Sequence, residues 1–263
     1  MNIAAILALA GLGCYAAVLY VVLSSPVHTR GRVRRLFAGS LVIMLIWQLS
    51  AVLVSLARRE GVAFAGYQAM SIAVVAFGVS YALFVRTFLM MENRGELAYG
   101  GTFLLLLTSA LVILARPSVI ESVYWSETAG FYLPRFGPLA ALLGIPYYLL
   151  LGYAAYLLLR GYQRAQQPIV RSRIQYLLLG WCILLLGTLA NFVPPLKNYP
   201  IDLLANVINA VLITYTIFRY QLLDISLVIR KGLAYTIPTT VIAVVYFLIV
   251  FLVEKLRSEE RRV

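Results

Sequence analysis

Residues that could carry acid–base, nucleophilic or metal chemistry are scarce in this sequence. The chain of 263 residues holds one histidine, His28, and two cysteines, Cys14 and Cys182, both within apolar runs. This set does not provide a Ser/His or Cys/His dyad, a disulfide scaffold, or a zinc or haem site with the usual ligand spacing. We therefore expect no metal and no other cofactor.

Charged side chains are almost absent from the apolar segments. Hydrophobic residues make up 62% of the chain and charged residues 12%, whereas soluble domains average about 25% charged residues, so a water-soluble globule is excluded. Asp and Glu are missing from the middles of the apolar runs, and Arg86 lies about a turn from the end of its run, where it can reach the interface. Proton relays, ion-coupled transport and intramembrane hydrolysis need such groups. The sequence therefore predicts that the chain is not an enzyme, and it disfavours a transporter.

Uncharged polar and aromatic residues gather near one expected face of the membrane. Trp125 and Tyr132 lie in the longest connection on that side, Asn191 follows an apolar run, and Asn206 and Asn209 share a face of the next run at i, i+3 spacing. These five residues could line a cup for a small, largely apolar ligand, since such sites combine apolar walls with a few polar groups. The alternative is structural: an interfacial aromatic belt with asparagines that form interhelical hydrogen bonds.

Eight apolar runs would position these residues. At about 20 residues per membrane span, the candidate transmembrane helices are residues 3–23, 36–56, 64–90, 99–115, 137–159, 174–193, 203–218 and 233–253. The run at 99–115 is the weakest because it is short and begins with two glycines. The sequence thus predicts an all-α fold, a polytopic membrane bundle of about eight transmembrane helices.

Basic residues give the bundle an orientation. The connections after the first, third, fifth and seventh runs hold 13 Lys and Arg residues, counting Arg86, and the other connections hold 5. The positive-inside rule therefore predicts a multi-pass membrane protein with its N-terminus outside. The net charge of +12 is explained by these connections, so we expect membrane lipids, and not nucleic acid, as partners.

The connection at 219–232 is predicted to couple the seventh run to the eighth. It is rich in Leu and Ile, and its charged residues Arg219, Asp224, Arg230 and Lys231 could face water or lipid headgroups, which is typical of an interfacial segment. The alternative is an ordinary connection whose basic residues only set the topology.

The same stretch carries a family resemblance. The run Arg219-Tyr220-x-Leu222-Leu223-Asp224-Ile225, followed by Val228-Ile229-Arg230-Lys231-x-Leu233-x-Tyr235, resembles the junction in bacterial two-component sensor histidine kinases that have a seven-helix N-terminal membrane region. The run Arg171-x-Arg173-x-Gln175-Tyr176 and the pattern Gly187-x-x-x-Asn191 fit the same resemblance. The resemblance implies a sensory membrane region over residues 1–218, a cytosolic junction over 219–232, and a further helix with a charged tail over 233–263.

The sequence also departs from such kinases. No histidine follows residue 28, and there is no Gly-rich nucleotide-binding segment. The resemblance therefore implies a sensory module without a catalytic output of its own. Such a module would act through a protein partner, which is a separate kinase or another output protein. The rival interpretation is a structural or assembly subunit of a larger membrane complex.

Overall fold

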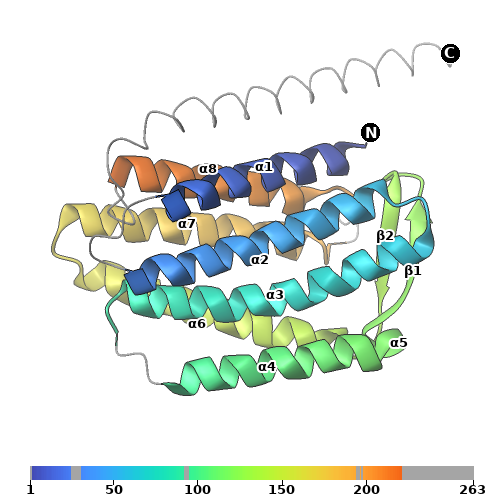
Figure 1. The fold of residues 1–263 in the computed structure, drawn as a ribbon, viewed down its shortest axis with the longest axis horizontal. Helices are drawn as coiled ribbons and strands as arrows, with labels where there is room; N and C mark the ends of the chain where they lie inside the picture. Colours follow the sequence, from blue (N-terminus) through green and yellow to red (C-terminus); the bar gives the residue numbers. More distant parts are fainter. Residues whose placement is uncertain (1, 25–30, 92–94, 194–195, 197, 221–263) are drawn as a thin grey trace, which may run out of the picture.

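Seven long helices make up most of the molecule. The computed structural model describes residues 2–24, 31–91, 95–193, 196 and 198–220 (Figure 1). The long helices are α1 (Ile3–Ser24), α2 (Gly31–Leu56), α3 (Glu60–Phe88), α4 (Gly95–Leu114), α6 (Ala140–Arg164), α7 (Pro168–Ala190) and α8 (Ile201–Tyr220). The short helix α5 (Arg116–Val119) leads into two strands, β1 (Ile120–Ser126) and β2 (Phe131–Phe136).

The first seven predicted spans each coincide with one long helix, which confirms a helical membrane bundle. Five helices, α1, α2, α3, α6 and α7, are long and apolar enough to cross a membrane, and α4 and α8 contain the shorter apolar segments Ala98–Leu114 and Ile201–Ile217. Several helices extend beyond the apolar run, as where α2 begins at Gly31 and so includes the basic residues Arg32 and Arg34. The eighth predicted span, 233–253, lies outside the described residues.

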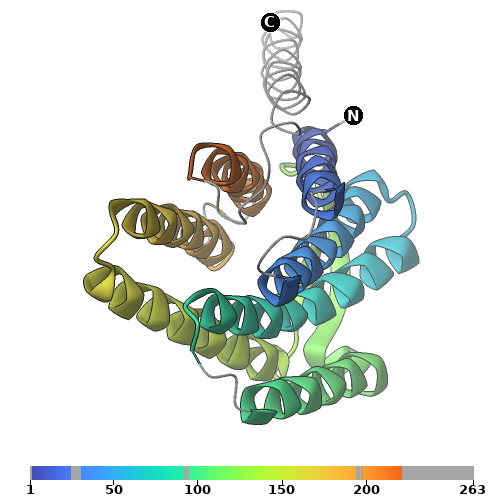
Figure 2. The ribbon, with the colours of Figure 1, turned by 60° about the vertical axis from the view of Figure 1, so that its left-hand side comes forward.

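Six of these helices form a closed ring. Neighbours pack in the order α1, α2, α3, α6, α7 and α8, and α8 packs back against α1 (Figure 2). The main core cluster lies inside this ring and is built from large side chains such as Tyr15, Phe84 and Leu158. Helix α4 lies outside the ring against α3, and most of its large apolar side chains are exposed, as with Phe103 and Leu114.

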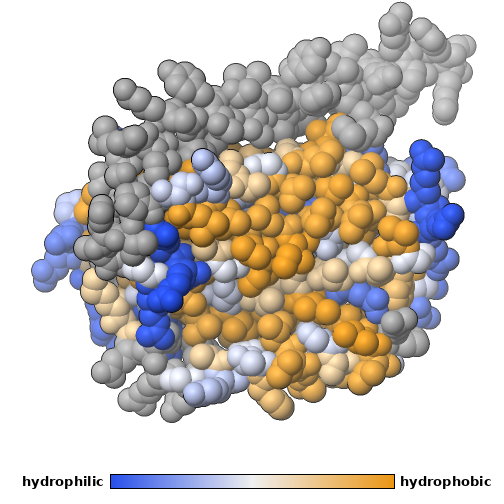
Figure 3. Space-filling model, in the orientation of Figure 1, coloured by the Kyte–Doolittle hydropathy of each residue, from blue (hydrophilic) through white to orange (hydrophobic). Residues whose placement is uncertain are grey.

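The surface divides into an apolar band and two hydrophilic ends. Apolar residues cover the middle of the visible face, and hydrophilic residues gather at its left and right edges (Figure 3). This division is what a bundle requires when its flanks contact lipid chains and its ends contact headgroups and water. The fold is therefore that of a multi-pass membrane protein.

The connection that the sequence presented only as a loop contains a β-hairpin. β1 and β2 pair antiparallel, with Tyr124 opposite Leu133 and Trp125 opposite Tyr132. Its turn includes Gly130, whose φ of 71° is a backbone conformation that glycine adopts readily. Aromatic and β-branched residues favour strands, so the hairpin is an element that the all-α prediction did not include.

The N-terminus of α1 is fixed to the hairpin by one side chain. The Asn2 Oδ1 atom accepts a hydrogen bond of 2.8 Å from the amide of Ala5 and so caps the helix. The Asn2 Nδ2 atom donates to the carbonyl oxygens of Ser55, at 3.0 Å, and Gly130, at 2.8 Å. One residue therefore connects α1, the end of α2 and the hairpin turn.

We predict that Asn2→Ala lowers the free energy of unfolding by about 2 kcal/mol, because it removes a helix cap and two further hydrogen bonds. Asn2→Ser is the matched control, since its hydroxyl oxygen can still cap the helix without the side-chain amide; its loss should be clearly smaller. Thermal unfolding in detergent micelles measures both. Equal losses in the two variants would contradict the capping role.

Candidate functional site

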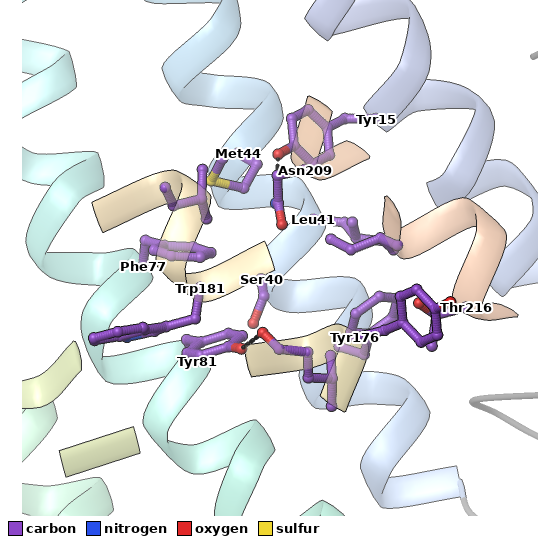
Figure 4. Close-up of a pocket in the computed structure, with 14 residues that line it drawn as sticks. Tyr15, Ser40, Leu41, Met44, Phe77, Tyr81, Tyr176, Trp181, Asn209 and Thr216 are labelled. Carbon is purple, nitrogen blue, oxygen red and sulfur yellow. Dashed lines mark hydrogen bonds between the residues drawn. The ribbon is translucent and has the colours of Figure 1, made fainter. Parts of the chain in front are cut away.

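A small cavity lies inside the helix ring. Its volume is about 30 Å³, which is room for about two water molecules. Five of the six ring helices supply its walls (Figure 4). The lining residues are Tyr15 from α1; Phe37, Ser40, Leu41 and Met44 from α2; Phe77 and Tyr81 from α3; Tyr176, Leu177, Trp181 and Leu184 from α7; and Asn209, Ile213 and Thr216 from α8.

Hydroxyl and amide groups provide the polar surface of this cavity. No carboxylate, lysine, arginine or histidine is among its described lining residues. Ser40 shares a hydrogen bond of 2.8 Å with Ser80 of α3, and the Trp181 Nε1 atom donates to the carbonyl of Leu151 at 3.0 Å. The cavity is thus suited to neutral groups that form hydrogen bonds, and burial of a bare charge there would be costly.

Tyr15 joins α1 to α8 at the edge of the cavity. Its hydroxyl donates to the Asn206 carbonyl at 3.1 Å and accepts from the Asn209 Nδ2 atom at 3.0 Å. Tyr15 is fully buried and Asn209 is nearly so, so both bonds are shielded from water. On the other side, α7 approaches so closely that a Cβ atom at Gly180 would collide with the Asn209 Oδ1 atom.

Gln48 is a buried amide close to the same level of the bundle. It is fully buried, and neither its Nε2 nor its Oε1 atom has a hydrogen-bond partner within the described structure. It lies against Gly11, one helical turn before Tyr15, where an added Cβ atom would be 2.7 Å from the Gln48 Cδ atom. The predicted set did not include Gln48, because that set was gathered around the outward connections and the seventh apolar run, and Gln48 lies in the second run.

The predicted ligand-contacting residues separate into two groups. Asn206 and Asn209 are buried in the bundle, where the Asn206 Nδ2 atom donates to the Asp202 carbonyl at 2.8 Å and its Oδ1 atom has no partner in the described part of the chain. Asn191 is exposed just after α7, near Asp202 in the first turn of α8. Asp202 is a further residue of this end that the predicted set did not include.

Trp125 and Tyr132 lie on the hairpin. Their rings meet edge to face with centroids 5.4 Å apart, and Trp125 is half exposed. Phe131 and Leu133, which point to the opposite face of the strand, pack with α1, α2 and Leu203. The structure therefore brings Asn206 and Asn209 together around Tyr15 and places the aromatic pair on the other face of the hairpin. The shared ligand cup remains a prediction.

Three tyrosines form a cluster at the end of α8, with Tyr215 and Tyr220 on α8 and Tyr176 on the neighbouring α7. The ring of Tyr176 lies 5.2 Å from that of Tyr215 and 5.1 Å from that of Tyr220, between centroids. The buried Arg173 donates from its Nε atom to the Tyr220 carbonyl at 2.7 Å, which places a positive charge at the negative end of the helix dipole. Arg219 is exposed in this last turn, whereas Asp224, Arg230 and Lys231 lie outside the described residues.

The fold and this arrangement define a helical membrane bundle whose inner cavity shares a lining residue, Tyr176, with the cluster at the end of α8. The comparison with known families agrees. Residues 6–226 match the model for the N-terminal 7TM region of histidine kinases, so the chain belongs to this family. This confirms the resemblance seen in the sequence, and the matched region is a non-catalytic sensory region. A search of curated proteins found no match.

We predict opposite effects of removing two buried amides. Asn209→Leu should lower the free energy of unfolding by about 1–3 kcal/mol, because Tyr15 loses a buried donor. Gln48→Leu should leave stability unchanged or raise it, since its amide is desolvated without compensation. Thermal unfolding of both variants in the same detergent tests this contrast. A loss for Gln48→Leu as large as that for Asn209→Leu would show that Gln48 has a partner.

Proposed function

We propose that this chain senses a stimulus within its helix ring and passes a conformational change inward along α8 to an output protein. The observation that carries the proposal is the position of Tyr176. This residue lines the central cavity and also contacts the last turn of α8. A change in the cavity that displaces the Tyr176 ring must therefore alter the packing of the last turn of α8.

The stimulus acts by favouring one of two arrangements of the ring. A ligand shifts such an equilibrium only by the difference between its affinities for the two states. A cavity of about 30 Å³ has room only for molecules the size of water, so a larger ligand must bind a state in which the ring is wider. The natural place for widening is the contact between α1 and α8, where Tyr15 provides two hydrogen bonds.

The end of α8 is well placed to transmit the change. Arg173 of α7 is bonded to the final carbonyl of α8, and Tyr176 lies on the same helix one turn later. When α7 moves relative to α8, the hydrogen bond from Arg173 and the aromatic contact of Tyr176 therefore both transmit the movement to Tyr220. The family match extends to residue 226, beyond this point, which agrees with an output connected through the segment that follows.

The proposed orientation has the N-terminus outside a bacterial cytoplasmic membrane. In Figure 1 one end of the bundle holds the end of α1, the start of α2, the start of α4, the turn from α6 to α7 and the end of α8. The described basic residues are concentrated there: Arg32, Arg34, Arg35, Arg86, Arg160, Arg164, Arg171, Arg173 and Arg219. The hairpin end holds fewer, among them Arg58, Arg59 and Arg135. The positive-inside rule favours the first end for the cytosol, and copurification from native membranes with a kinase or other output protein would support the proposed partner.

The orientation predicts which side of the membrane each turn faces. With Cys14 and Cys182 replaced by alanine, a cysteine at the exposed position Thr128 of the hairpin turn should react with an impermeant thiol reagent in intact cells. A cysteine at Gln166, exposed between α6 and α7, should react only after permeabilisation. The reverse pattern would overturn the orientation.

We predict that Tyr176→Ala loosens the end of α8, because Tyr215 and Tyr220 lose a shared aromatic neighbour. Hydrogen exchange of the amides at 215–220 should become at least several-fold faster, with little change at the start of α8. Leu179→Ala is the matched control, since Leu179 is an exposed residue of α7, the helix that carries Tyr176. Unchanged exchange in Tyr176→Ala, or the same change in both variants, would remove the coupling route.

A further inference from the structure

A shallow groove lies where α2 turns into α3, at the hairpin end of the bundle. We call it the α2–α3 groove, and its volume is about 390 Å³, within the range of small-molecule sites. Its walls are apolar except for two successive arginines. The lining residues are Val52, Leu53, Leu56, Ala57, Arg58, Arg59 and Val62.

The two arginines give the groove a concentrated positive charge. Arg58 and Arg59 are both exposed, and neither forms an ion pair with any residue in the described part of the chain. Glu60 follows them as the first residue of α3, where its carboxylate is stabilised by the N-terminal end of the helix. Two guanidinium groups beside each other are therefore available to an outside anion, and guanidinium groups bind phosphate oxygens in a bidentate manner.

An exposed apolar stripe on α2 runs directly into this groove. Along one face of the helix, at spacings of three and four residues, lie Val42, Ile46, Leu49, Leu53 and Leu56, each between 43% and 51% exposed. From Leu56 back to Ile46 the helix rises about 15 Å. This is half of the roughly 30 Å hydrocarbon thickness of a bilayer, or the depth of one leaflet.

These observations together lead to a ligand class. We propose that the α2–α3 groove binds one anionic phospholipid, with its phosphate on Arg58 and Arg59 and an acyl chain along the stripe that ends at Leu56. A soluble anion would use the arginines but leave the apolar walls bare. A zwitterionic lipid would fill the walls, but the positive charge of its headgroup would offset its phosphate and leave the two guanidinium groups only partly neutralised.

The bound lipid would act on the hairpin end of the bundle. The carbonyl of Ser55, just before the groove, accepts a hydrogen bond from Asn2. Ala57, which lines the groove, packs in the cluster that contains Val119 and Ile120 at the start of the hairpin. Occupancy of the groove is therefore linked to the position of the N-terminus and of the hairpin. The inference does not depend on the proposed sensory function.

The test compares lipids bound to the purified, delipidated full chain by native mass spectrometry. The probes are phosphatidylglycerol, phosphatidylcholine and soluble glycerol phosphate. We expect one phosphatidylglycerol to bind about tenfold or more tightly than phosphatidylcholine, since each basic residue contributes about a tenfold factor or less near an anionic headgroup. The double variant Arg58→Gln/Arg59→Gln should lose this preference.

Two controls make the result specific. Arg160→Gln/Arg164→Gln removes two exposed arginines at the other end of the bundle and should keep the preference. Leu53→Ser should weaken the binding of phosphatidylglycerol without creating affinity for glycerol phosphate. The thermal unfolding curve of this variant verifies that it is folded. Equal binding of the two lipids, equal loss in both arginine double variants, or displacement of the lipid by glycerol phosphate at similar concentration would each overturn the proposal.

Discussion

The hydroxyl group of Tyr15 holds the contact that makes the helix ring a ring. Helices α1 and α8 are far apart in the sequence, and membrane helices gain little from burying apolar surface against each other because lipid chains are equally apolar. Hydrogen bonds and close packing must supply the specificity instead. Tyr15 provides it by donating to one residue of α8 and accepting from another. Without this contact the central cavity would be an open cleft between two halves of the bundle.

The same need for close packing explains two glycines. Gly180 allows α7 to approach Asn209, and Gly11 allows α1 to approach Gln48. In both places a glycine of one helix faces a side-chain amide of the neighbouring helix. Side-chain amides therefore occupy the interior layer near Tyr15, and because they carry no net charge they can be buried at moderate cost.

The sequence was sufficient for the helices and for the family, because a membrane leaves few alternatives for an apolar run of about 20 residues. It was less informative about contacts between residues that lie far apart in the sequence. Nothing in the local pattern indicates that Tyr15 meets Asn209, or that Gln48 of a different apolar run lies close to the same level of the bundle. The hairpin was missed for another reason: its strands are short, and their aromatic residues had an equally good explanation as an interfacial belt. Of the predicted site, Asn206 and Asn209 both contact Tyr15, Asn206 through its backbone carbonyl and Asn209 through its side chain.

The unpartnered amide of Gln48 has an energetic consequence for a bundle with two states. A buried polar group without hydrogen bonds costs about 1–3 kcal/mol, and each 1.4 kcal/mol changes an equilibrium tenfold. Any rearrangement of α1 that gives Gln48 a partner recovers part of this cost. Gln48 lies against α1 only one turn from Tyr15, so the same helix carries both the contact that stabilises the present ring and the contact that penalises it. Under the proposed sensory function, a ligand then needs only a small difference in affinity between the two states to change the balance.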